Sequence, residues 1–461
     1  MRLPQYFPAG TKQRGAALMI MLVVMIIGAI TIFVSSLNSS ALKIERDKAT
    51  AAALAQAKDA LVGYAITYGD THAGQVHGYL PCPDIDGSAS GNLEGSSELS
   101  CGGKNVSSNG KLPWKTLGLP TLRDGHGECL WYAVSGTFQS NQKTDMMNWD
   151  TPGLFEILDA SGSTVAQNVV AVVFAPGAAL DGQNRASDGT APTCGGNYTP
   201  ANYLDNDGTI NNAAVSGTAN AISQFRLGAS AQLNDQIIFI TRDDIFNARN
   251  IRAKLAAMTQ KAAECLADYG NRNSSGLGNK RLPWSGRLRN PTSDYWTDSN
   301  YDDEDNRLAG RLPYRVNTSD ADTGNQIDYP YYQLASNGAN CPGVADWPAY
   351  YPWWSNWKDH LFYALADDFK PKDSSGSCGT CLRVNGSGSY AAVVMFADRK
   401  LAGQSRDSGA DRLNFANYLE GRNFTNGSNW FGNGNYQSGA ETADFNDVLY
   451  CIRPDLTVTP C

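Results

Sequence analysis

The sequence predicts an α+β protein in which a long N-terminal helix precedes two tandem heads, each a helix packed on an antiparallel sheet and held by disulfides. Three observations support this fold class. The chain has no proline between Ala16 and Leu80, and its composition there favours helix. Short motifs of the first half recur in the same order in the second half. The 10 cysteines, an even number, are typical of an oxidising compartment.

The N-terminus combines a short basic leader with an uncharged apolar segment. Lys12-Gln13-Arg14-Gly15 runs directly into Ala16–Val34, which contains no charged residue. At about 1.5 Å per residue this segment is roughly 28 Å long, close to the hydrocarbon thickness of a bilayer. Because the leader is positive, we expect it in the cytoplasm and the bulk of the chain on the other side. A secretory signal differs, because its cleavage site follows the apolar region.

The junction Arg14-Gly15-Ala16-Ala17-Leu18 resembles the signal of the type IV prepilin-like family. The resemblance implies that a prepilin peptidase removes residues 1–15 after Gly15 and methylates Ala16. It also implies that residues 16–35 form a transmembrane and filament-core helix, and that the heads are pilin-like. The protein would be a single-pass inner-membrane protein with its bulk in the periplasm, or outside the cell in a filament. The alternative is a plain signal anchor holding an unrelated extracytoplasmic domain.

The fifth residue of the mature chain departs from the family pattern. Most pilins have a glutamate there, which pairs with the amine of a neighbouring subunit, whereas this chain has Ile20. A carboxylate inside the membrane is costly and is retained only where it has a partner. Members that lack it include the K-type pseudopilin of type II secretion and some minor pilins at the filament tip. The resemblance therefore implies a tip or initiating subunit. Separately, Gly28 is the one weak point of the assembly helix inside the membrane, because glycine destabilises a helix interior.

The helix is expected to continue beyond the membrane to about Tyr68. Apolar residues recur there at steps of three and four, as in a helix that packs one face on a sheet. They are Leu54, Ala57, Leu61, Tyr64 and Ala65. We expect about 50 residues of continuous helix, half of it inside the first head.

Internal repeats divide the rest of the chain into a first head, residues 36–244, and a second head, residues 245–461. The order of the matching motifs is kept over some 200 residues. The matches pair 59–64 with 264–269, 129–134 with 360–365, 172–185 with 394–406, 202–204 with 417–419, and 234–235 with 446–447. We interpret them as a tandem duplication.

Proximity within each head suggests the disulfide pairing, which the sequence alone does not fix. The proposed pairs are Cys82–Cys101, Cys129–Cys194, Cys265–Cys341, Cys378–Cys381 and Cys451–Cys461. Cys378-Gly-Thr-Cys381 could instead be a redox motif or half of a zinc site. A structural bridge is preferred because no thioredoxin-like context surrounds it.

Two acidic loops raise the possibility of calcium binding. Asp84 and Asp86, and likewise Asp205 and Asp207, place oxygen ligands two residues apart with a glycine following. Neither loop completes an EF-hand, and solvated Asp/Gly turns are the alternative. No other cofactor is expected.

The segment Trp347–Trp357 is the densest aromatic run. Aromatic faces bind sugars or protein partners, and they also fill cores. We expect Trp357 and Phe362 in the core, and Tyr350, Tyr351 and Trp353 as possible exposed binding residues for a surface glycan or protein ligand.

Charge and motif content limit the function. The net charge of -8 becomes about -11 once the three leader cations are lost, so binding of nucleic acid by bulk charge is not expected. The chain has four histidines and neither a zinc-protease motif nor a phosphate-binding loop. The sequence therefore predicts a non-enzymatic minor subunit of a type IV pilus or a type II secretion pseudopilus, working with other pilins or pseudopilins. The alternative is a signal-anchored carbohydrate-binding adhesin, or a polysaccharide hydrolase with two carboxylates in a cleft.

Overall fold

The structure is a computed structural model, and the part of the chain that it describes excludes the first 13 residues and several internal segments. The described residues are 14–72, 75–87, 93–140, 146–228, 232–273, 280–288, 302–313, 341, 343–371, 374–425 and 434–461. Between residues 14 and 39 the side chains described are those of Met21, Leu22, Met25 and Ile26. The side chains of residues 272–273 also lie outside the described set.

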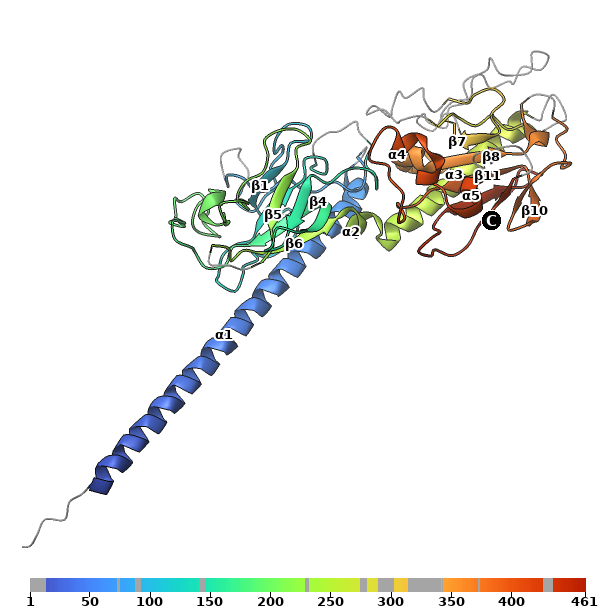
Figure 1. The fold of residues 1–461 in the computed structure, drawn as a ribbon. Helices are drawn as coiled ribbons and strands as arrows, with labels where there is room; N and C mark the ends of the chain where they lie inside the picture. The colour runs from blue at the N-terminus through green and yellow to red at the C-terminus, as the bar shows by residue number, and fades with distance from the viewer. Residues whose placement is uncertain are drawn as a thin grey trace, which may run out of the picture.

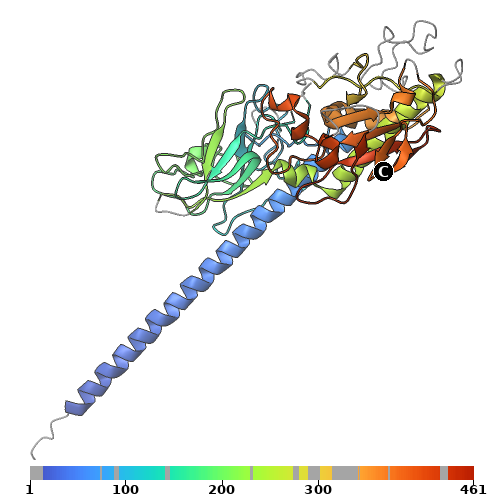
Figure 2. The same cartoon turned by 45° about the vertical axis from the view of Figure 1, so that its right-hand side comes forward.

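The N-terminal helix is one continuous element, as predicted. Helix α1 spans Arg14–Thr71, 58 residues, and Figures 1 and 2 show it as a rod whose upper end enters the first head. Residues 40–49 are all exposed, and burial begins at Thr50. No helix in the described part of the chain has the length and apolar character needed to cross a membrane. Most side chains of the predicted membrane segment, residues 16–35, lie outside the described set.

The first head is built on a six-stranded sheet around one long strand. Its order is β1-β2-β4-β3-β5, with β6 also pairing with β4, and every pairing is antiparallel except that of β3 with β5. The strands are β1 (Ser108–Lys111), β2 (Trp131–Val134), β3 (Phe155–Leu158), β4 (Thr164–Ala175), β5 (Ser223–Arg226) and β6 (Gln236–Thr241). Strand β4 is buried from Val169 to Ala175 because α1 covers one face and loops cover the other.

Helix α1 packs on the first sheet through the predicted stripe. Leu54, Ala57, Leu61 and Ala65 are buried, and the helix lies against β4 and β6. Burying each leucine is worth roughly 1.5–3 kcal/mol. Gly125 makes the closest approach to the helix, because a Cβ there would lie 2.3 Å from the Arg46 carbonyl oxygen. Its backbone N–H donates to Thr50 Oγ1 at 2.9 Å.

A short helix joins the two heads. Helix α2 (Arg242–Phe246) has a capping box formed by Thr241 and Asp244, and α3 (Arg249–Asn273) begins three residues after α2 ends. The predicted boundary at residues 244/245 falls inside α2.

The second head has a five-stranded antiparallel sheet, ordered β14-β13-β11-β8-β7. Helix α3 packs on β11, β13 and β14. The strands are β7 (Ala309–Arg311), β8 (Leu361–Leu365), β11 (Ala392–Phe396), β13 (Val448–Ile452) and β14 (Val458–Pro460). A small separate sheet, β10-β9-β12, contains β9 (Leu382–Val384), β10 (Ser387–Tyr390) and β12 (Asn435–Tyr436). The described part of the second head also contains the helices α4 (Trp347–Trp357) and α5 (Gly421–Thr425) and the short 3-10 helices η4 (Lys358–His360), η5 (Asp367–Phe369), η6 (Asp411–Leu413) and η7 (Phe415–Asn417). The short 3-10 helix η1 (Pro200–Asn202) lies in the first head.

The centres of the two sheets have the same arrangement. The neighbours β2-β4-β6 in the first head correspond to β8-β11-β13 in the second, and each set is covered by a long helix. Matching tyrosines also make the same contact, because Tyr132 donates to the Pro81 carbonyl at 3.1 Å and Tyr363 to the Pro283 carbonyl at 3.2 Å. The heads differ at the periphery, where β3 and β5 extend the first sheet while β9 and β12 form a sheet of their own.

All five predicted disulfides are present: Cys82–Cys101, Cys129–Cys194, Cys265–Cys341, Cys378–Cys381 and Cys451–Cys461. Every bridge lies within one head. No free cysteine remains among the ten.

The two heads share one apolar core. A single cluster of buried side chains extends from Ala53 in the first head to Leu456 in the second. At the contact between heads, Trp149 meets Trp357 edge-on, with ring centroids 4.9 Å apart. Asn148 donates to the Asn356 carbonyl at 2.7 Å. The segment 146–150 of the first head therefore packs directly on α4 and η4 of the second.

We expect Leu61→Ala to lower the free energy of unfolding by about 2–5 kcal/mol, because it leaves a cavity between α1 and the sheet. The measurement is urea unfolding of the full chain in detergent, followed by tryptophan fluorescence. Leu42→Ala is the matched control, since Leu42 is on the same helix but 60% exposed. It should change the stability by less than about 0.5 kcal/mol. Equal losses in the two variants would contradict this account of how the helix is held.

Candidate functional site

The exposed part of α1 is a candidate assembly surface. Met21, Leu22, Met25 and Ile26 are between 50% and 66% exposed, and Leu42 and Ile44 are 60% and 63% exposed. Large apolar side chains grouped on a bare helix indicate a surface that another molecule or a lipid phase covers. Charged residues of both signs flank Ile44, at positions 43 and 45–48.

The predicted processing and assembly residues lie on this helix. Gly15, Ala16, Ile20 and Gly28 fall within the backbone of α1, while their side chains lie outside the described set. Cleavage after Gly15 and the effect of Ile20 stay predictions.

The upper half of α1 is tied to the first head by a polar contact as well as by its apolar stripe. Lys58 Nζ donates to the Phe239 carbonyl at 3.0 Å and pairs with Asp244 Oδ1 at 2.9 Å. Asp244 also completes the capping box of α2, so one carboxylate joins the N-terminal helix to the connection between heads. The position of helix α1 is thereby linked to α2, the connection that leads into the second head.

Each head contains a buried pair of carboxyl groups on the loops beside its central strands. In the first head, Asp205 N donates to Asp235 Oδ2 at 2.8 Å, and Asp235 N donates to Asp205 Oδ2 at 3.0 Å. Gln183 Nε2 donates to Asp205 Oδ1 at 2.8 Å, and Asn212 Nδ2 to Asp235 Oδ2 at 3.1 Å. These bonds hold together loops that are far apart in the sequence.

The second head repeats this network at the matching positions of the sequence repeat. Glu420 N donates to Asp447 Oδ2 at 3.0 Å, and Asn446 N to Glu420 Oε2 at 3.2 Å. Gln404 Nε2 donates to Glu420 Oε1 at 2.8 Å, and Asn423 Nδ2 to Asp447 Oδ2 at 2.9 Å. The one change of residue type is Glu420 in place of Asp205.

An arginine accompanies each acid pair, half-buried in the first head (Arg185) and fully buried in the second (Arg406). Arg185 Nε donates to the Asn202 carbonyl at 3.0 Å and its guanidinium lies over the ring of Tyr203. Arg406 likewise donates to the Asn417 carbonyl at 2.5 Å and lies over Tyr418. Their carboxylate partners differ in origin. Arg185 Nη1 pairs with Glu128 of its own head at 3.3 Å, whereas Arg406 Nη1 lies 3.6 Å from Asp150 Oδ1 of the other head.

Burial shifts the titration of the acid pairs. Burial, reinforced by Asp205, raises the pKa of Asp235 to about 8, and burial also raises the pKa of Asp205. In the second head, burial and Glu420 raise the pKa of Asp447 well above its usual value, and burial raises that of Glu420. Two neighbouring buried carboxyls do not both ionise easily, so the pair in the first head retains a proton near neutral pH, and the second pair is shifted in the same direction.

These pairs have the composition, but not the accessibility, that the hydrolase alternative requires. Their carboxyl groups are between 1% and 7% exposed, and backbone and side-chain amides occupy most of their oxygens. A hollow of about 670 Å³ lies beside the first pair, with Asp181, Gln183, Asp205 and Asn206 among its lining residues. Asp235 is not among them, so the pair as a unit does not face the hollow.

The residues predicted to bind calcium are not grouped around one centre. Asp84 is buried and accepts hydrogen bonds from Gly87 N, Gly95 N and the Tyr198 hydroxyl. Asp86 is half-buried. Asp207 accepts from two backbone amides and pairs with Arg226 at 3.0 Å, and Asp205 belongs to the acid pair. N–H donors therefore occupy oxygens that a cation would use, and calcium binding stays a prediction.

The expected exposure of the aromatic run is wrong for two of its three residues. Tyr351 and Trp353 are buried, at 8% and 7% exposed, while Tyr350 is half-buried. Trp353 is covered because His77 of the first head stacks on it, with ring centroids 4.2 Å apart. Trp357 and Phe362 are in the core, as predicted.

Sequence reasoning missed the chemistry of the acid pairs and of Asp150. The repeated Asn-Asp at 234–235 and 446–447 was the available signal, because a polar dipeptide kept before both apolar strands indicates a shared role. Asp150 carried no signal, since its partners are in the other head.

Comparison with known proteins found no match. No protein-family model, curated protein or solved structure matches this chain.

We expect Asp235→Asn to flatten the pH dependence of stability. The raised pKa means that the folded state holds a proton that the unfolded state loses at about pH 4, so Asp235 makes stability fall as pH rises from about 4 to 8. The neutral amide removes up to about 1.4 kcal/mol per pH unit of that slope. The measurement is urea unfolding at pH 5, 6.5 and 8.

Asp447→Asn should behave in the same way, because the pKa of Asp447 is raised for the same reason. Asp181→Asn is the control, since Asp181 is exposed. Curves for Asp235→Asn that run parallel to the wild type would contradict a shared buried proton.

Proposed function

We propose that this chain is a non-enzymatic minor subunit of a filament of the type IV pilin class, in a tip or initiating position. The filament is either a type IV pilus or a type II secretion pseudopilus. The N-terminal part of α1 would lie in the inner membrane and then enter the helical core of the filament. The two heads would cap or decorate that filament from outside the cytoplasm.

The observation that carries the proposal is the form of α1. A 58-residue helix is held by the head only over its C-terminal part, and its exposed part carries large apolar side chains. A long exposed helix gains little stability by itself, so an external partner is needed to cover it. A membrane and then neighbouring subunits would be such partners in succession.

Two further features support the same class. The Arg14-Gly15-Ala16 junction resembles the signal that prepilin peptidase recognises. With Ile20 at the fifth mature position, the chain also resembles the subunits that lack the glutamate most pilins carry there. The five disulfides fit folding outside the cytoplasm. Ile20 favours the K-type pseudopilin, whereas the large double head favours a tip adhesin of a pilus.

The direct test is mass spectrometry of the mature N-terminus from cells with and without prepilin peptidase. We expect a peptide that begins at N-methylated Ala16 and is absent without the peptidase. Gly15→Leu should retain the leader, because the resemblance places the cleaved bond after this glycine. Gly28→Ala is the matched control, a glycine of the same helix away from the junction, and it should be processed normally. An intact leader in the wild type would instead indicate a plain membrane anchor.

A second candidate function, glycan binding by the first head, rests on the hollow beside Asp205. Its walls present carboxylate and amide groups, including Asp181, Asn206, Asn211 and Gln232, which suit a ligand rich in hydroxyl groups. Glycan-array binding by the full chain would test it. Asp181→Ala should reduce a signal that Asp444→Ala, a change of an exposed acid in the second head, leaves intact. A blank array would exclude this function and leave the filament proposal unaffected.

A further inference from the structure

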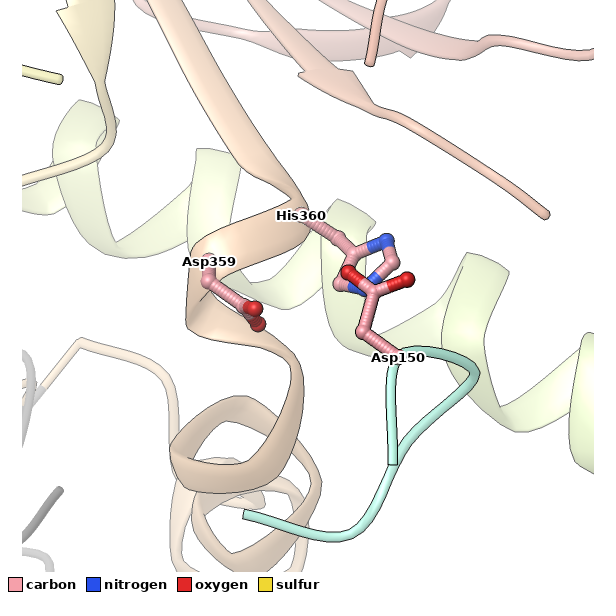
Figure 3. Close-up of side chains that lie close together, drawn as sticks. All are labelled: Asp150, Asp359 and His360. Carbon is pink, nitrogen blue, oxygen red and sulfur yellow. The ribbon is translucent and has the colours of Figure 1, made fainter. Parts of the chain in front are cut away.

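A cluster of three potential metal ligands lies where the two heads meet. Asp150 comes from the loop before β3 in the first head, and Asp359 and His360 come from η4 in the second (Figure 3). One ligand atom from each residue lies within 4.8 Å of the others. Their ligand atoms come together although the sequence separates Asp150 from Asp359 and His360 by about 200 residues.

The carboxylate of Asp150 is buried without a hydrogen bond. Its side chain is only 6% exposed, and neither oxygen has a hydrogen-bond partner. The nitrogen atoms that pair with it are at long distances, 3.3 Å from Oδ2 to His360 Nε2 and 3.6 Å from Oδ1 to Arg406 Nη1. An ionised group in the interior normally has short, directed partners. Asp150 is therefore aimed at a position that no protein donor fills.

The ring of His360 is oriented as in a metal ligand. Its Nδ1 lies 2.8 Å from the Ala397 carbonyl oxygen, which can only accept, so Nδ1 carries a hydrogen. In the neutral ring this leaves a lone pair on Nε2, which also has no hydrogen-bond partner and faces Asp150. Metal-binding histidines commonly donate their other N–H to a backbone carbonyl in this way. Arg406 Nη1 lies 3.1 Å from Nδ1, so its contact with the ring is at Nδ1 and Nε2 receives none from it.

Asp359 is also fixed by a neighbour outside the cluster. Asn148 Nδ2 donates to Asp359 Oδ1 at 3.2 Å, which leaves Oδ2 for another partner. Ligands bound tetrahedrally to zinc at 2.0–2.2 Å lie roughly 3.3 Å apart. The 3.3 Å between Asp150 Oδ2 and His360 Nε2 matches that separation. The Asp359 carboxylate would have to move inward by roughly 1–2 Å to complete the set.

We propose that Asp150, Asp359 and His360 form a divalent-cation site, best suited to Zn²⁺, that joins the two heads. One imidazole nitrogen and two carboxylate oxygens are an accepted zinc set, with a fourth position left for water. The ion would neutralise both carboxylates, while Arg406 pairs with the other oxygen of Asp150. This inference does not depend on the filament function, because it concerns only how the heads are joined.

The alternative to a metal ion between Asp150 and His360 Nε2 is a proton. A second proton on His360 would give an imidazolium paired with Asp150 and would balance the charges of Asp150, Asp359 and Arg406. The two possibilities differ in one measurable quantity, the amount of metal bound per chain.

The experiment measures zinc in the full chain, purified in detergent without a polyhistidine tag. The protein is stripped with EDTA, loaded with Zn²⁺, dialysed and measured by elemental mass spectrometry. We expect about one zinc per chain, with binding weakened on the order of tenfold or more in Asp150→Asn and His360→Gln. Circular dichroism verifies that each variant is folded.

His126→Gln is the matched control. His126 is an exposed histidine of the first head and belongs to no three-ligand cluster in the described residues. This variant should keep the zinc. Loading the wild type with Co²⁺ adds a test that needs no variant, because a tetrahedral site gives strong visible absorption. A wild type that retains no zinc and gives no such spectrum would overturn the proposal and assign the position between Asp150 and His360 to a proton. Zinc loss in His126→Gln equal to that in His360→Gln would also overturn it.

Discussion

The arrangement of the heads depends on one constraint, the need of a buried arginine for a carboxylate. Arg406 is fully buried and its guanidinium stays charged at any physiological pH. The equivalent Arg185, which is half-buried, pairs with Glu128 of its own head. The second head obtains its carboxylate from Asp150 of the first. Burial raises the pKa of Asp150, but the nearby basic side chains, Arg406 foremost, outweigh it and hold that pKa far below the usual range.

The pairing of Arg406 in the second head with Asp150 of the first explains why the two heads form one body although each has its own sheet. Asp150 reaches Arg406 only if the loop 146–150 lies against α4 and η4, and in that position Trp149 meets Trp357. Apolar contact and charge compensation therefore require the same relative placement of the heads. Separating them would expose the aromatic contact and leave a charged arginine in the second head without its carboxylate, which is a costly combination.

Features set by local periodicity could be predicted from the sequence, whereas features set by contacts between heads could not. The stripe of α1 follows from a period of three to four residues, and the disulfides follow from cysteines that are near one another within a head. The matching strands β2 and β8 were visible as the repeats 129–134 and 360–365. In contrast, Trp353 is buried by His77, which is distant in sequence. The raised pKa of Asp235 likewise needs the burial that only the fold supplies.

The length of helix α1 has a geometric consequence for the two heads at its end. At about 1.5 Å per residue, the 58 residues of α1 span roughly 87 Å. With both heads fastened to one end as a single mass, the helix acts as a lever. A tilt of about 10° at the far end would swing the heads through roughly 15 Å, about the reach of ten helical residues. Small changes in the orientation of helix α1 would thus produce large displacements of the two heads.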